Sequence, residues 1–134
     1  MIVDTSVWID FLRPGSNPAG DRLEEMVTTG ERIVVPETVL MELLSGPTDE
    51  VVAAQRQRML EAFDLEPVVP LADSVRAASL QRSCRRGGDT VRNLGDCLIA
   101  ATALRLDLPV LHRDRDFEVL ARHSDLRTES LLDA

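Results

Sequence analysis

The stretch of sequence that decides the fold runs from residue 92 to residue 117, RNLGDCLIAATALRLDLPVLHRDRDF. Its apolar spacing predicts a helix capped by Asn93, in which Asp96, Ile99 and Ala103 share one face. Asp96 therefore heads a stripe that should face the core, which is an unusual place for a charge. An alternative is a capping box, in which Asp96 reaches back to the amide of Asn93.

A short buried strand and two acids follow this helix. Val110 and Leu111 form an apolar run that is typical of a parallel strand covered on both faces. Asp114 and Asp116 come soon after it, past the carboxyl end of the predicted strand. In open α/β sheets ligands bind at this edge, so the two acids are candidates for a functional site.

The order of the other predicted elements indicates an α/β fold. Apolar strands at 2–3, 33–35 and 65–69, and a last strand at 126–127, alternate with helices. This alternation predicts a parallel sheet of about four to five strands flanked by helices, with the proline-containing strand at 65–69 on an edge. Asp4 follows the first strand, and Glu42 lies in the apolar helix after the second. Their ordinary alternatives are a helix N-cap for Asp4 and a solvent-facing position for Glu42.

Length and composition favour one globular domain spanning residues 1–134. No apolar run approaches the roughly 20 residues that cross a bilayer, and no basic leader precedes the first strand, so we expect a soluble, cytoplasmic protein. The net charge of −8 counts, by itself, against nucleic-acid binding. Cys84 and Cys97 lack metal-site spacing, and we expect them to be reduced core thiols.

The acids should converge, because the carboxyl ends of parallel strands share one edge of a sheet. Carboxylates that lie close together need a proton or a cation, and oxygen ligands are what Mg²⁺ and Mn²⁺ take. Bound metal would also reverse the local field and attract a phosphate, which offsets the acidic net charge. The sequence therefore predicts metal-dependent hydrolysis of a phosphodiester.

Arginine supplies all 15 basic residues of the chain. A cluster precedes the central helix and comprises Arg82, Arg85, Arg86 and Arg92, while Arg113 and Arg115 alternate with the two aspartates. Guanidinium groups suit phosphate binding. The dipole at a helix C-terminus also favours arginine, so both interpretations of the cluster stay open at this point.

Four motifs carry a family resemblance: MIVDTS at 1–6, VLMELL at 39–44, DCLIAATA at 96–103 and HRDRDF at 112–117. In this order and spacing they resemble a PIN domain, specifically a VapC-type toxin of a bacterial toxin–antitoxin pair. The resemblance implies an α/β/α sandwich and Mg²⁺- or Mn²⁺-dependent endoribonuclease activity. It also implies a homodimer and a cognate antitoxin whose C-terminal segment lies across the active site.

The resemblance assigns roles to the acids position by position. Asp4, Glu42, Asp96 and Asp114 match the family's catalytic acidic quartet, and Asp116 matches an accessory acid of many members. Direct metal ligation is implied for Asp4, Asp96 and Asp114, with Glu42 acting through water or through a second metal.

Two further positions are read through the resemblance. Thr5 or Ser6 matches a hydroxyl that helps to hold the metal's water, whereas His112 departs from the more frequent Thr or Ser. Contact with phosphate and cover of the sheet edge both fit His112, and we favour the second. An apolar first helix could receive the antitoxin, with Trp8 as its exposed anchor; core packing of Trp8 is the alternative.

Rival functions remain to be weighed. A phosphatase or phosphotransfer domain also uses an acidic pocket above a parallel sheet, but no acid closely follows Asp4 and the chain has no Lys. A calcium loop beginning at Asp114 is excluded because Val119 stands where a glycine is needed. A non-catalytic, PIN-like partner-binding module is disfavoured because the acidic set is complete.

Overall fold

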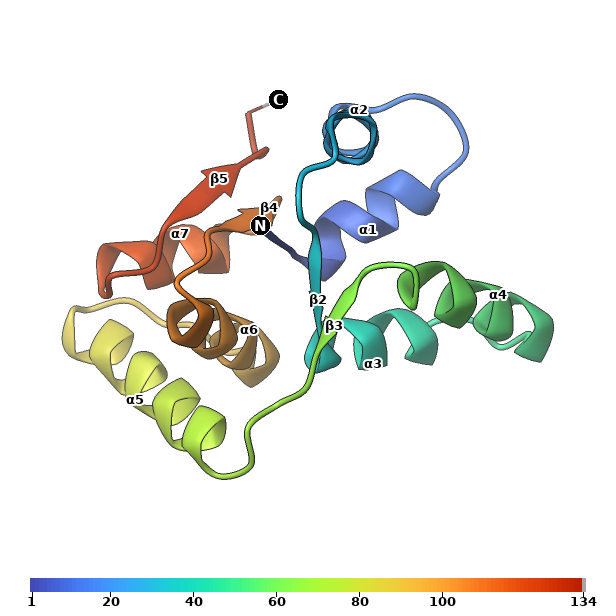
Figure 1. Ribbon diagram of the computed structural model, residues 1–134. Helices are drawn as coiled ribbons and strands as arrows, with labels where there is room; N and C mark the ends of the chain where they lie inside the picture. Colours follow the sequence, from blue (N-terminus) through green and yellow to red (C-terminus); the bar gives the residue numbers. More distant parts are fainter. Residues whose placement is uncertain (134) are drawn as a thin grey trace.

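The computed structural model describes residues 1–133, and within them five strands form one sheet in the order β3-β2-β1-β4-β5 (Figure 1). The strands are β1 (Ile2–Val3), β2 (Val34–Pro36), β3 (Asp64–Glu66), β4 (Val110–His112) and β5 (Thr128–Ser130). Every neighbouring pair is parallel. The three central strands are buried throughout, as expected for strands covered on both faces.

Helices cover both faces of this sheet, which confirms the predicted α/β/α sandwich. They are α1 (Thr5–Leu12), α2 (Pro18–Thr29), α3 (Glu37–Ser45), α4 (Glu50–Leu60), α5 (Ala72–Arg86), α6 (Leu94–Leu106) and α7 (Arg115–Arg122). Figure 1 shows α1 and α2 on one side of β2, and α5 with α6 on the other. No helix among residues 1–133 is long and apolar enough to cross a membrane.

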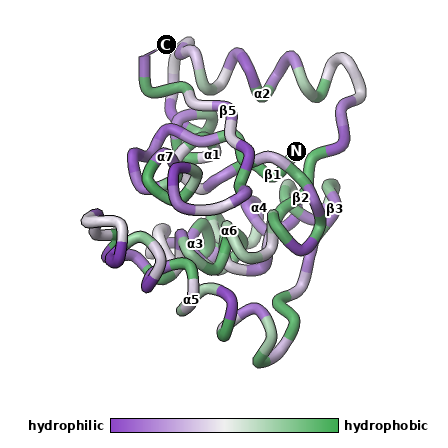
Figure 2. The backbone as a smooth tube through the Cα atoms, turned by 90° about the vertical axis from the view of Figure 1, so that its left-hand side faces the viewer, coloured by the Kyte–Doolittle hydropathy of each residue, from purple (hydrophilic) through white to green (hydrophobic). Residues whose placement is uncertain are grey.

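The central helix α6 is buried on most of its surface. Asp96, Ile99, Ala100 and Ala103 are all at most 3% exposed, so the stripe predicted from their spacing does face the core. Small side chains allow this helix to pack closely against α5 and α7. Figure 2 shows hydrophobic residues where the strands and inner helices meet, and hydrophilic stretches along α2. The two cysteines, Cys84 and Cys97, are free and buried, as expected.

Aspartate and asparagine side chains cap the helices that begin at the carboxyl edge of the sheet. The Asp4 side chain caps α1, Asn93 caps α6, and Asp114 caps α7. In each case a side-chain oxygen accepts a backbone N–H from the first turn, at 2.8–3.0 Å. These caps fix where each helix begins relative to the strand or loop before it.

Two strands differ from their predicted bounds by two or more residues, and the second and fourth strands differ by one. The last strand is Thr128–Ser130, not 126–127, because Leu126 is a buried anchor and the carbonyl of Arg127 only begins the pairing by accepting from Val110. The third strand is Asp64–Glu66, not 65–69, because Pro67 has no N–H to continue the ladder. Its place at the sheet edge is confirmed.

The expectation that Trp8 is an exposed anchor was wrong. Trp8 is 0% exposed and its ring packs edge-on against Phe63, with 5.3 Å between ring centroids, and against Phe11 at 6.0 Å. Burial of so large an aromatic ring is strongly favourable. The core-packing alternative therefore holds, and the exposed apolar side chains of α1 are Ile9 and Phe11.

Candidate functional site

Three carboxylates meet where β4 ends and α6 begins. Asp96, Asp114 and Asp116 each offer one oxygen, and these oxygens lie within 4.8 Å of one another. Asp96 comes from the first turn of α6, while Asp114 and Asp116 come from the turn into α7. We call these three residues the acidic triad.

Asp4 lies beside the acidic triad and is held by its own helix. Asp4 is 3% exposed, and its Oδ2 accepts the Ser6 backbone N–H at 3.0 Å and the Ser6 hydroxyl at 2.5 Å. The Ser6 hydroxyl oxygen also accepts the backbone N–H of Arg113 at 3.0 Å. Ser6 therefore joins the end of β1 to the end of β4, which fixes Asp4 beside the acidic triad.

Glu42 approaches the same site from α3. The Thr5 hydroxyl donates to Glu42 Oε1 at 3.0 Å, and the side chain is half-buried. Glu42 Oε2 lies 3.8 Å from the position that a Cβ atom on Gly95 would take. The Glu42 side chain of α3 therefore reaches the first turn of α6, next to Asp96. Glu42 is thus not a simple solvent-facing residue, because it has a specific partner at the end of β1.

The surroundings of Asp96 strongly disfavour its ionised form. Burial, then the charge of Asp4, then the neighbouring Asp116 and Asp114 hold the pKa of Asp96 well above its usual range. Its Oδ2 atom is buried and has no hydrogen-bond partner within residues 1–133. A buried carboxylate oxygen without a partner costs several kcal/mol unless a proton or cation accompanies it.

Burial also raises the pKa of Asp4 from 3.8 to about 6, although the hydrogen bonds from Ser6 oppose this rise and Glu42 adds to it. The capping box predicted as an alternative for Asp96 is not formed. Asn93 caps α6 with its own side chain, and the described residues include no hydrogen bond from the Asn93 amide to Asp96.

The acids at this site offer carboxylate oxygens as ligands, and one of these oxygens, Asp96 Oδ2, is buried without a partner among the described residues. This set of ligands therefore fits a hard divalent cation.

His112 is a structural residue of β4. It is 0% exposed, its Nδ1 accepts the backbone N–H of Asp114 at 3.2 Å, and its ring packs 5.3 Å from that of Phe117. Burial lowers its pKa, which favours the neutral ring. Contact between His112 and a phosphate is excluded by this burial, and its bond to Asp114 helps to orient an acid of the triad.

Sequence reasoning missed Asp10, a buried acid of α1. Asp10 is 5% exposed and forms salt bridges with Arg113 at 2.6 Å and Arg13 at 3.1 Å. The charge of Arg113 is therefore already balanced by Asp10, which corrects the interpretation that Arg113 is available to bind phosphate. The available signal was an acid on the inner side of an apolar helix, the same signal that singled out Asp96.

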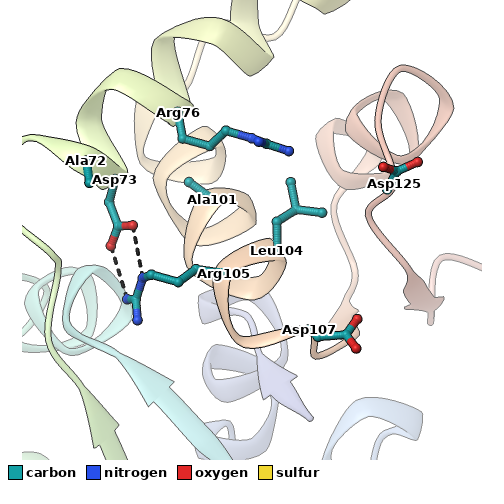
Figure 3. A pocket seen from close by; sticks show the side chains of 8 residues that line it. All are labelled: Ala72, Asp73, Arg76, Ala101, Leu104, Arg105, Asp107 and Asp125. Carbon is teal, nitrogen blue, oxygen red and sulfur yellow. Dashed lines mark hydrogen bonds and ion pairs between the residues drawn. The ribbon is translucent and has the colours of Figure 1, made fainter.

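One sizeable pocket lies away from the acidic site. It has a volume of about 490 Å³ and lies at the opposite end of α6, where Arg76, Arg105, Asp107 and Asp125 line it (Figure 3). Arg105 is held there by two hydrogen bonds to Asp73 at 3.1 Å, drawn as dashed lines in Figure 3. The acidic triad instead lies at the carboxyl edge of the sheet.

Comparison with known proteins gives consistent family matches. The PIN domain matches residues 1–123. Ribonuclease VapC11 of Mycobacterium tuberculosis is 34% identical over 131 residues, which cover 97% of this chain and 98% of the relative. Ribonuclease VapC19 of the same species is 37% identical over 116 residues, covering 82% of this chain and 85% of the relative.

Solved structures agree at the level of the fold. A chain in the crystal structure of VapBC2 from Rickettsia felis, bound to a promoter DNA fragment, has a TM-score of 0.75 at 16% identity and covers 96% of both chains. The family itself is shown by the sequence matches across nearly the whole length. The chain belongs to the PIN-domain family, among its VapC-type members.

Proposed function

We propose that this protein is the toxin of a toxin–antitoxin module and acts as a divalent-cation-dependent endoribonuclease in the cytoplasm. The observation that carries the proposal is the Oδ2 atom of Asp96 within the acidic triad, which is buried and has no hydrogen-bond partner among the described residues. The ribonuclease names of the relatives supply the reaction class. A parallel sheet whose carboxyl edge gathers acids supports a phosphodiester as the substrate.

The cation would be held by Asp96 and Asp114, with Asp116 or Asp4 completing the set. Asp4 was expected to be a direct ligand together with Asp96 and Asp114, but Asp116 shares the grouping of oxygens within 4.8 Å, and Asp4 accepts hydrogen bonds from Ser6. Oxygen donors favour Mg²⁺ or Mn²⁺. When bound, such an ion would act as a Lewis acid and stabilise the negative charge that develops on the phosphodiester during hydrolysis.

The other side chains would prepare the site for this ion. Ser6 holds Asp4 against the triad, and the backbone N–H of Asp114 is bound by His112, so two acids have fixed orientations. Glu42 is the half-exposed acid at the rim, and its bond from Thr5 aims it at the first turn of α6. We assign to Glu42 the orientation of the attacking water.

The partners proposed for this chain are an antitoxin and a second copy of itself. Solved structures that share this fold include VapBC2 from Rickettsia felis and VapBC from Salmonella typhimurium, which supports an antitoxin as the binding partner. Ile9 and Phe11 of α1 are 42% and 37% exposed, and we assign to them the contact with the antitoxin that was first expected of Trp8.

A homodimer is supported by three exposed apolar side chains, those of Met41, Val75 and Leu94. Equilibrium sedimentation that shows only a monomer would contradict this proposal.

The test of the nuclease proposal is incubation of antitoxin-free protein with total cellular RNA in Mg²⁺, Mn²⁺ or EDTA. New RNA ends are mapped by sequencing for the wild type, for Asp96→Asn and for Asp125→Asn. Asp125 is an exposed acid at the far end of α6 and serves as the matched control. We expect discrete, metal-dependent ends that vanish only in Asp96→Asn. Metal-dependent ends that persist in Asp96→Asn would contradict the assignment of the site.

A further inference from the structure

Four exposed arginines near the end of α5 and the start of α6 form no salt bridge among residues 1–133. Seven of the 15 arginines form salt bridges within residues 1–133. The partnerless ones include Arg82, Arg85 and Arg86 in the last turns of α5, and Arg92 just before α6. We call these four the α5–α6 arginine group. In a chain with 23 acids, four neighbouring arginines that find no carboxylate need an explanation.

The arginine group borders a preformed pocket. Arg85 and Arg92 line a hollow of about 250 Å³ together with Gln81, Thr90 and Val91. The Gln81 side chain donates to the backbone carbonyl of Val91 at 2.8 Å, which ties the loop at 87–92 back onto α5. The two guanidinium groups therefore flank a space that exists before any ligand binds.

The loop is also fixed from the side of α7. Asp89 Oδ2 lies 2.7 Å from His123 Nε2, and the His123 ring lies so close over Gly87 that a Cβ there would overlap it. This contact leaves the loop little freedom, so binding would cost little ordering entropy. Figure 1 shows the loop passing from α5 to α6 beneath α7.

The pocket lies on the same side of the molecule as the acids. Arg92 directly precedes Asn93, the residue that caps α6 and begins the turn that carries Asp96. At the end of α5, the charge of Asp116 contributes to the raised pKa of Cys84, after burial and Asp89. The arginine group is thus a neighbour of the acidic triad through both α6 and α7.

Favourable interaction with a helix dipole explains the positions of only some members of the α5–α6 arginine group. Arginines in the last turn of α5 are favoured by its dipole. Arg92, however, lies just before the N-terminus of α6, where the helix dipole opposes a cation. A guanidinium that is exposed, unpaired and placed against a dipole is better explained by an anionic ligand, and its planar donors match phosphate oxygens.

We propose that Arg85 and Arg92, with the pocket between them, bind a backbone phosphate of single-stranded RNA next to the bond that is cut. This inference rests on the proposed nuclease function and adds a subsite to it. Elsewhere the chain is acidic and repels RNA, so the arginine group selects the path along which the strand reaches the acidic triad. Arg82 and Arg86 extend this path along α5.

The test measures binding of a short, fluorescein-labelled, single-stranded RNA by anisotropy, in EDTA and over a series of KCl concentrations. The double variant Arg85→Ala/Arg92→Ala is compared with the wild type and with Arg76→Ala. Arg76 is an exposed arginine on the same helix, also without a salt bridge among the described residues, and it lies at the opposite end of α5 (Figure 3). It is therefore a control for charge alone.

We expect the double variant to lose affinity by about 10- to 100-fold, and the slope of log affinity against log salt to fall by about 0.7, the value for the one phosphate that the two arginines neutralise. Arg76→Ala should keep both. A double lysine variant, Arg85→Lys/Arg92→Lys, should keep the slope while losing part of the affinity, since the charge stays and the bidentate geometry is lost. Equal affinity and slope in wild type and alanine variant would overturn the subsite.

Cleavage of total RNA by the wild type in Mg²⁺ is measured alongside. Cleavage by the wild type together with unchanged RNA binding in the double alanine variant refutes the subsite alone. If the wild type cleaves nothing, the nuclease proposal fails, and the subsite loses its place beside a scissile bond.

Discussion

Replacing Asp4 with Asn should stabilise the metal-free protein at alkaline pH while destroying its activity. Asn keeps the shape of the protonated acid, and it can still cap α1 and accept from Ser6. Burial raises the pKa of Asp4 from 3.8 to about 6, so the ionised carboxylate costs the folded state about 3 kcal/mol at 1.36 kcal/mol per unit. The uncharged amide removes this cost.

The sign of the effect sets its pH dependence. The folded state holds the Asp4 proton more tightly than the unfolded chain does, so this stabilisation is complete below pH 3.8 and is lost as pH rises through about 6. Asp4→Asn should therefore gain about 3 kcal/mol over wild type at about pH 8 and about 0 at about pH 4. Saturating Mg²⁺ should shrink the gain, since it stabilises the wild type more than the variant.

Urea unfolding in EDTA, followed by circular dichroism at several pH values, measures this difference. Asp125→Asn is the matched control, because Asp125 is exposed and remote from the acidic triad. It should show no comparable gain. An Asp4→Asn variant whose advantage is equal at both ends of the pH series, or is absent at about pH 8, would refute the assigned burial of charge.

Three further predictions concern packing around the site. Trp8→Ala should cost about 4 kcal/mol in unfolding free energy, and a loss below about 1 kcal/mol in a urea titration would show that Trp8 is not core. Gly87→Ala should lower the melting temperature because its methyl group overlaps the His123 ring, and restoration of that temperature by the double variant with His123→Ala checks the cause. Arg113→Ala leaves the buried Asp10 with one partner and should cost about 1–2 kcal/mol after allowance for the exposure of Arg113. An unchanged denaturation midpoint would argue against that salt bridge.

Local features of the sequence predicted much of the fold. The caps at Asp4 and Asn93 and the buried stripe of α6 follow from residue type and helical period, which operate within a few residues. The parallel order follows from alternation of strands and helices. The last strand was predicted at 126–127, two residues too early, because its residues, Thr128–Ser130, carry no apolar signal and pair with β4 through backbone register.

Contacts between distant segments account for what the sequence did not predict. From the sequence, Trp8 looks like an exposed anchor, but in the fold Phe63 packs against it. Asp10 likewise looks like a surface acid, but Arg113, the residue after β4, forms a salt bridge with it. The sequence indicated which acids are candidates for the site, but which of their carboxylate oxygens lie closest together depends on the three-dimensional packing. Asp116 shares the closest group, while Ser6 holds Asp4 beside it.

Binding of Mn²⁺ to the antitoxin-free protein, followed by electron paramagnetic resonance at neutral pH, tests the central claim most directly. The free-ion signal should fall as wild type and Asp125→Asn are added, and Asp96→Asn should bind at least about tenfold more weakly, because it removes a carboxylate of the acidic triad. If Asp96→Asn binds Mn²⁺ as tightly as wild type does, the acidic triad is not the metal site, and the account of the catalytic centre is wrong.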